Sequence, residues 1–195
     1  DVSGSDPGTG SLIIKKGATV SVGSIKAGAN VTVDAEGMAA GDEINFTANL
    51  SQYTGTLSVI NNDKLEAQIV DGKIVLATKP VAKIGETVYG TFYEAVKIAK
   101  TGDTITLLDD AELEFIDNPQ YNNVYASEIN LNGKTLTIRD HDIRFDEITI
   151  LNGSIVVEPG LSASTAIFLM YDKNITFNDV DITATGLTGT YLIGQ

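Results

Sequence analysis

Short runs in which apolar and polar residues alternate fill most of the first 78 positions of the chain. Period-2 runs bounded by Gly, Asn and Asp are typical of β-strands that bury one face. They predict strands over residues 12–14, 19–22, 30–33, 44–48, 56–60, 67–70 and 73–77. Asp71-Gly72, between the last two runs, predicts a two-residue hairpin turn because both residues tolerate positive φ.

The stretch YGTFYEAVKIAKTGDTITLLDD, residues 89–110, is the one place where the period becomes helical. Its apolar positions follow the i, i+3, i+4, i+7 spacing of a helix with one buried face: Phe92, Ala95, Val96 and Ala99. Thr91, three residues before Glu94, predicts a capping box at the start. Gly102 is expected to end the helix as its left-handed C′ residue, and a strand then begins at Thr104.

Beyond Asp110 three phrases resemble one another: EINLNGKTLTI, EITILNGSIVV and NITFNDVDITA. Each places an alternating run on both sides of an Asn-Gly or Asn-Asp step, at Asn132, Asn152 and Asn178. Irregular periods of two dozen residues suit the coils of a β-solenoid, in which each coil buries its apolar face against the next. Asn174 and Asn178 are expected in turns where stacked amides bond successive coils.

The segment VAKIGETVYGTFYEAVKIAKTGDTITLLDD, with INLNGKTLTI and LNGSIVV after it, resembles a repeat of large surface proteins of gut bacteria. The resemblance covers residues 81–185 and includes Gly85, Glu94, Gly102, Asp103 and Asn152-Gly153. It implies a right-handed parallel β-helix of the pectate-lyase-like type. It also implies that the helix is a lid over the first coil, which would protect an open sheet edge.

Three regions follow from these patterns. Residues 1–10, DVSGSDPGTG, are expected to form a flexible tether that begins after a processed segment. Residues 11–80 form a β-rich region that is either a small β-sandwich or the last coils of an upstream solenoid. Residues 81–195 form an all-β, capped β-helix that is either truncated or continued by another chain.

Composition narrows the classes of partner. The chain has 26 acidic and 13 Lys or Arg side chains, a formal charge of −13, which repels nucleic acid and anionic lipid. It contains no Cys, so thiol catalysis and Cys-ligated zinc are excluded. No apolar run is long enough to cross a bilayer, so no membrane insertion is expected. No cofactor is expected either, although the acidic side chains on the surface could bind a calcium ion.

The loop DNPQYNNVYAS is the first candidate binding site. Glycan-binding surfaces use exposed aromatic rings for stacking and amides for hydrogen bonds, and this loop supplies both in Tyr121, Asn122, Asn123 and Tyr125. It also interrupts the spacing of the repeat, as an inserted loop on one edge of a solenoid would. An ordinary structural loop is the alternative.

The segment RDHDIRFDE is the second candidate, and it holds the only His and the only two Arg residues of the chain. Its members are Arg139, Asp140, His141, Asp142, Arg144 and Asp146. A polysaccharide lyase needs a base and cationic groups that neutralise uronate carboxylates, and this segment could supply them. The alternative is a solvated turn whose opposite charges pair on the surface.

These observations predict a non-enzymatic, adhesin-like or structural segment of a secreted or cell-surface bacterial protein, with glycans or a host surface as partners. A carbohydrate-active enzyme on the same scaffold, either a polysaccharide lyase or a glycoside hydrolase, is one alternative. A structural spacer or a self-assembling surface fibre is another, and self-association or continuation of the solenoid belongs with it.

Overall fold

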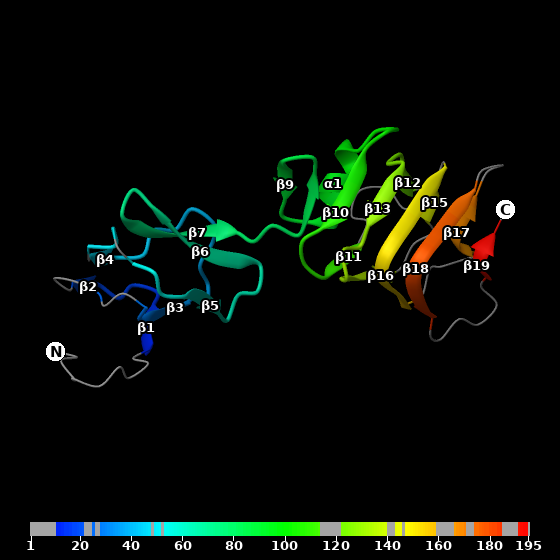
Figure 1. The fold of residues 1–195 in the computed structure, drawn as a ribbon. Coiled ribbons are helices and arrows are strands. Elements are labelled where there is room, and N and C mark those ends of the chain that lie inside the picture. The colour runs from blue at the N-terminus through cyan, green and yellow to red at the C-terminus, as the bar shows by residue number, and fades with distance from the viewer. Residues whose placement is uncertain are drawn as a thin grey trace. The chain divides into compact units, whose positions relative to one another are not determined.

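The computed structural model describes residues 11–21, 25, 28–47, 49–51, 53–113, 122–139, 143–145, 147–158, 166–170, 174–184 and 191–194. Contacts divide the chain into an N-terminal unit, Asp1–Lys79, and a C-terminal unit, Pro80–Gln195 (Figure 1). Each unit has its own hydrophobic core. The fold is predominantly β with a single short helix among the described residues, as the sequence predicts.

The N-terminal unit begins with strands that stack in parallel. Its first five strands are β1 (Ser11–Lys15), β2 (Val20–Ser21), β3 (Asn30–Asp34), β4 (Phe46–Thr47) and β5 (Leu57–Ile60). β3 pairs in parallel with both β1 and β5, so that Leu12, Val31 and Leu57 lie in one row. β2 pairs in parallel with β4. Residues about 19 and 26 positions apart therefore lie side by side, which is the arrangement of solenoid coils.

An antiparallel hairpin follows this stack. β6 (Leu65–Val70) and β7 (Lys73–Thr78) are joined by Asp71 and Gly72, which have φ of 51° and 76°. These positive angles confirm the predicted two-residue turn. The Ile74 carbonyl accepts the Ile44 N–H at 3.0 Å, and Ile74 is fully buried. The hairpin thus completes the core of the N-terminal unit.

The C-terminal unit is a parallel β-solenoid, and the described residues hold about five solenoid turns. The parallel strands are β10 (Thr104–Leu107), β11 (Ala111–Leu113), β12 (Asn122–Val124), β13 (Glu128–Asn130), β14 (Thr135–Arg139), β15 (Ile143–Phe145), β16 (Ile148–Glu158), β17 (Ala166–Met170), β18 (Ile175–Ala184) and β19 (Tyr191–Gly194). The first stack contains β10, β13 and the first halves of the long strands β16 and β18 (Figure 1). The second stack contains β11, β14 and the second halves of β16 and β18.

The register of these strands puts equivalent apolar residues on top of one another. Ile105 pairs with Ile129, Ile129 with Ile150, and Ile150 with Phe177. The three isoleucines are buried, which supplies most of the driving force for stacking. The third stack runs in the order β12-β15-β17-β19, one strand from each coil. The predicted parallel stacking beyond Pro80 is confirmed.

A hairpin and the helix lie at the N-terminal end of this stack. β8 (Ala82–Ile84) pairs antiparallel with both β9 (Thr87–Tyr89) and β10, so the outer edge of β10 is covered. Helix α1 (Phe92–Ile98) follows directly and buries Phe92, Ala95 and Val96 in the solenoid core. The predicted role of the helix as a lid over the first coil agrees with this packing.

The helix begins as predicted and ends earlier. The Thr91 side chain accepts the Glu94 N–H at 3.1 Å, while the Glu94 carboxylate accepts the Thr91 N–H at 3.2 Å, which is a complete capping box. The C-cap is Ala99, so the assignment of Gly102 as the C′ residue is wrong. Gly102 has φ of 99° in the following turn, where its N–H donates to Ser127 Oγ at 2.8 Å.

Left-handed residues turn the chain from the first stack into the second. Asn132, Asn152 and Asp179 have φ of 52°, 60° and 53°. Asn178 instead lies in register with Leu151, one position before the turn, which corrects its predicted equivalence with Asn132 and Asn152. Asp replaces Asn at the left-handed position because both side chains tolerate that conformation.

Candidate functional site

Two segments that the sequence offers as separate candidates lie next to each other in the third stack. β12 contains Asn123, and the following coil contributes β15 with Arg144. The two strands are parallel, and Asn123 is the register partner of Arg144. The aromatic-amide segment and the ionic segment therefore share one sheet, although 21 positions separate these two residues in the sequence.

The side chains after Asn122 alternate between the core and solvent. Val124 and Ala126 are each 1% exposed and belong to the solenoid core. Asn123 and Tyr125 are exposed, and Tyr125 shows 53% of its surface. Asn123 lies in β12, and Tyr125 is the first residue after that strand. The buried Val124 and Ala126 fix the backbone on both sides of Tyr125, so the exposed amide and aromatic ring are presented from a packed segment. This pair, Asn123 and Tyr125, is called the amide–tyrosine pair below.

The other members of the aromatic-amide candidate are less well placed. Tyr121 lies outside the described residues, and Asn122 is described only as the first residue of β12. What the structure brings together is therefore the amide–tyrosine pair and the backbone of β15 beside it.

Arg139, at the end of β14, is held by two glutamates from neighbouring coils. Its Nε lies 2.7 Å from Glu112 Oε1 and 2.9 Å from Glu158 Oε2. Glu158 is also its register partner in β16. All three side chains are about half exposed, so each pair contributes a fraction of a kcal/mol, about 0.2–1 kcal/mol. The guanidinium ties three coils together across the second stack.

The rest of the ionic candidate is described only in part. Arg144 is placed by its strand, while Asp140, His141, Asp142 and Asp146 lie outside the described residues. The ion pairs of Arg139 run along the second stack, whereas Arg144 lies in the third. The ionic segment therefore passes from one sheet of the coil to the next.

Amide side chains at the corner between the first two stacks bond one coil to the next. Asn132 Nδ2 donates to the Leu107 carbonyl at 3.1 Å, and Asn152 Nδ2 donates to Asn130 Oδ1 at 3.4 Å. The Asp110 carboxylate accepts the Thr135 N–H at 2.8 Å. The predicted bonding between coils by the side chains of Asn174 and Asn178 stays a prediction, while the Asn174 carbonyl accepts the Ile148 N–H of the preceding coil at 3.2 Å. These polar groups hydrogen-bond neighbouring coils to each other, and we assign them a structural role.

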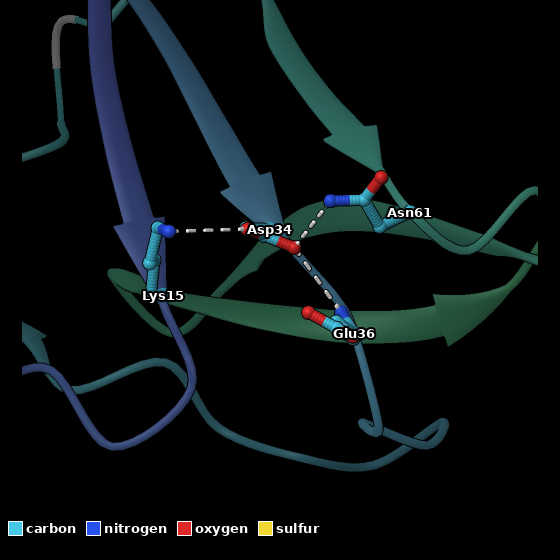
Figure 2. Close-up of polar contacts among 4 residues, drawn as sticks. All are labelled: Lys15, Asp34, Glu36 and Asn61. Carbon is cyan, nitrogen blue, oxygen red and sulfur yellow. Dashed lines mark hydrogen bonds and ion pairs between the residues drawn. The ribbon is translucent and has the colours of Figure 1, made fainter.

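A buried carboxylate in the N-terminal unit was not predicted from the sequence (Figure 2). Asp34, the last residue of β3, is only 8% exposed. Its Oδ1 accepts Asn61 Nδ2 at 2.9 Å and the Glu36 N–H at 3.3 Å. Lys15 Nζ lies 4.0 Å from its Oδ2, and Lys15 is its register partner in β1.

These contacts lower the pKa of the Asp34 carboxyl, first through the hydrogen bond from Asn61, with the Glu36 amide and the charge of Lys15 adding to it against the opposing effect of burial. Asn61 itself has φ of 62°, so the carboxylate also holds the left-handed residue that ends β5. The carboxylate contacts residues of three coils, because Lys15 lies in β1, Asp34 in β3 and Asn61 directly after β5. We therefore assign it a structural role.

The described residues contain no group of three or more His, Cys, Asp or Glu side chains that could hold a metal ion. Within the same residues, no helix has the length and apolar character needed to span a membrane.

Comparison with known proteins gives no family for the chain: no family model, no curated protein and no solved structure matches it.

Proposed function

We propose that this chain is a non-enzymatic segment of a bacterial cell-surface protein and that it binds neutral glycans through the amide–tyrosine pair on its third stack. The observation that carries this proposal is the pair of exposed side chains around the buried Val124: Asn123 lies within β12, and Tyr125 follows directly after that strand. Aromatic rings stack on the apolar faces of sugars, and amides bond to sugar hydroxyls on both their donor and acceptor sides.

The scaffold supports a binding role because it fixes these groups before any ligand arrives. Strand β12 pairs with β15 and is anchored by Val124 in the core. A side chain presented from a packed strand loses less conformational freedom on binding than one on a free loop. The third stack also continues through β17 and β19, so a chain of sugars would find an extended surface beside the pair.

Charge favours neutral ligands over anionic ones. The formal charge of −13 repels uronates, phosphates and sulfates over distances of about one Debye length, roughly 8–10 Å. Arg139, one of the two arginines, already has both neighbouring glutamates within ion-pair distance. The proposed ligand is therefore an uncharged glycan.

The finer identity of the scaffold is part of the same proposal. We infer a right-handed, pectate-lyase-like β-helix of an exported, adhesin-like protein. Two points support it: the segment from Val81 onward resembles repeats of gut-bacterial surface proteins, and crossover connections between parallel strands are almost always right-handed. Glycans of a host or of its diet are the expected partners.

A glycan array tests the proposal directly. Tyr125→Ala and Asn123→Ala should each reduce the signal on neutral glycans about tenfold, because loss of one stacking or bidentate contact is worth about 1–2 kcal/mol. Tyr125→Phe should retain most of the binding if the ring stacks. Ile98→Ala, which removes a similarly exposed apolar side chain from α1, is the matched control and should leave the profile unchanged.

Three results would overturn the proposal. The first is an array on which the parent chain and Tyr125→Ala give equal profiles. The second is turnover of a uronate polysaccharide that is lost in Arg139→Ala or Arg144→Ala, since this would make the chain a lyase. A parent chain that binds no glycan at all would leave the structural spacer as the function.

A further inference from the structure

Five Asn residues of the chain stand two positions before a Ser or Thr, with no Pro between them. This Asn-x-Ser/Thr sequence is the acceptor motif for N-linked glycans, which are attached at surface loops of secreted proteins. All five are exposed, so neither the motif nor exposure chooses among them. They are Asn30, Asn45, Asn49, Asn152 and Asn174.

Two of the five motifs are held by the parallel strands of the N-terminal unit. Asn30 is the first residue of β3, and the hydroxyl of Thr32 in the same motif shares a hydrogen bond of 2.9 Å with the Ser58 hydroxyl of β5. The Asn45 carbonyl accepts the Val20 N–H of β2 at 2.7 Å. Both motifs therefore contribute to bonds between neighbouring strands.

The two motifs of the C-terminal unit are held in a similar way. Asn152 lies within β16 at a left-handed corner, and its Nδ2 donates to Asn130 Oδ1 at 3.4 Å. The Asn174 carbonyl accepts the Ile148 N–H of the preceding coil at 3.2 Å. An enzyme that took up either motif would have to break bonds between coils.

Asn49 lies in the connection between β4 and β5, and its side chain bonds within its own motif. Its Oδ1 accepts the Ser51 backbone N–H at 3.1 Å and the Ser51 hydroxyl at 2.7 Å. Asn49 and Ser51 are both exposed, while Leu50 between them is only 6% exposed and belongs to the core. The buried Leu50 anchors the turn and leaves both polar side chains of the motif in solvent.

We propose that Asn49, assisted by the Ser51 hydroxyl, is an acceptor for N-linked glycosylation by an oligosaccharyltransferase, with an oligosaccharide linked to a lipid pyrophosphate as the donor. Asn49 Nδ2 bonds to the anomeric carbon of the donor, while the bond from that carbon to the pyrophosphate oxygen breaks. The lipid pyrophosphate leaves with the electron pair, and the Nδ2 proton passes to a base of the transferase. This modification is independent of glycan binding by the amide–tyrosine pair.

The contacts of Ser51 suit this step because of the atom to which they are made. Loss of the Nδ2 proton moves negative charge onto the amide oxygen, since the nitrogen and the oxygen share the π electrons of the amide. The hydroxyl and the backbone N–H of Ser51 both donate to that oxygen and stabilise the charge. Neither hydrogen bond uses Nδ2, the atom that forms the new bond.

Glycan transfer to the folded chain tests the site. The probe is a purified oligosaccharyltransferase that recognises Asn-x-Ser/Thr, supplied with its own lipid-linked donor. The intact mass of the parent chain should increase by that of a single glycan, and glycopeptide mapping should place the glycan on Asn49. Asn49→Gln should abolish the addition. Asn30→Gln, which removes another exposed motif from the same unit, is the matched control and should leave it unchanged.

Two substitutions of Ser51 test the role of its hydroxyl. Ser51→Ala should slow transfer about tenfold, because a hydrogen bond to a group that gains charge is lost. Ser51→Thr keeps the hydroxyl and should retain most of the rate, and circular dichroism should show both variants folded like the parent. A parent chain that gains no glycan, a glycan on another Asn with Asn49 unmodified, or equal rates for the parent and Ser51→Ala would overturn the proposal.

Discussion

The two units place their antiparallel elements at opposite ends of their parallel stacks. In the N-terminal unit the coils come first and the β6–β7 hairpin follows them. In the C-terminal unit the β8–β9 hairpin and α1 come first and the coils follow. In both cases the antiparallel element contributes buried residues to the core, Ile74 and Leu76 in one unit and Ala82 in the other.

The positions of these elements show where each parallel stack starts and stops. Every coil offers the next one an edge of the same kind, so nothing in a coil limits growth. An antiparallel hairpin or a helix ends the series because it cannot be extended in the same register. The chain therefore joins the finishing end of one stack to the starting end of another.

The largest effect is expected at the helix that seals the C-terminal unit. Phe92→Ala leaves a cavity against the first coil and should lower the free energy of unfolding by about 3–5 kcal/mol. Hydrogen exchange resolved by peptide should show the loss of protection in β10 and β11, with β3 and β7 unchanged. Ile98→Ala, on the exposed side of the same helix, should change stability by less than about 0.5 kcal/mol.

A substitution in the hairpin of the N-terminal unit should destabilise that unit and leave the C-terminal unit unchanged. Ile74→Ala removes a fully buried side chain and should cost about 2–5 kcal/mol. Protection should be lost in β3 and β5 and retained in β13 and β16. Equal loss in both units, from this variant or from Phe92→Ala, would show that the two stacks unfold as one body.

The close approach of two coils at Gly153 is the next test. A Cβ at this position would lie 2.6 Å from both Leu131 Cβ and the Lys134 carbonyl oxygen. Gly153→Ala should therefore destabilise the C-terminal unit by about 1–3 kcal/mol in urea unfolding. Ser154→Ala is the neighbouring control, because Ser154 donates only its backbone N–H to Lys134. A neutral Gly153→Ala would contradict the observed register of β14 and β16.

Acid should weaken the N-terminal unit through Asp34. Folding lowers the pKa of this carboxyl, so its contribution is present above its unfolded value of about 3.9 and is lost as the pH falls through the lower native pKa. Asp34→Asn should be less stable than the parent chain at pH 7, and the difference should shrink at pH 2–3. A difference that stays constant with pH would exclude the ionised carboxylate as its cause.

The smallest effect is expected at Arg139. Arg139→Ala breaks both ion pairs, but the groups are about half exposed and should contribute less than about 2 kcal/mol in total. The loss should fall further in 1 M salt, which screens exposed charges. If the free energy of unfolding fell by more than about 2 kcal/mol, the association of the three coils would depend on these two ion pairs.

Local signals in the sequence predicted the elements that seal the stacks. Thr91 and Glu94 are three residues apart, and each side chain accepts a hydrogen bond from the backbone N–H of the other. Asp71 and Gly72 form their turn through their own positive φ angles. The parallel stacking also followed from the sequence, because each repeated phrase carries the same alternation. The capping box and the turn depend on residues that lie close together in the chain, and the stacking depends on a pattern that recurs in each coil.

Features that depend on contacts between coils could not be predicted in the same way. Asp34 accepts a hydrogen bond from Asn61, 27 positions further along the chain, and Asn123 is in register with Arg144, 21 positions further along. Both pairings depend on the lengths of the intervening turns. The turn lengths differ from coil to coil, as the pairs Glu128–Thr149 and Thr149–Thr176 show. A fixed repeat therefore misplaced Asn178 by one position relative to the left-handed Asp179.

Spin labels on β16 and β18 test the parallel stack most directly. Thr149 and Thr176 are register partners, whereas Thr183 is the partner of Val156, on the far side of the corner. Labels at Thr149→Cys and Thr176→Cys should show strong dipolar broadening in the frozen state, and labels at Thr149→Cys and Thr183→Cys should show little. The reverse result, with Thr149 close to Thr183, is what an antiparallel pairing of these strands would give, and it would contradict the solenoid.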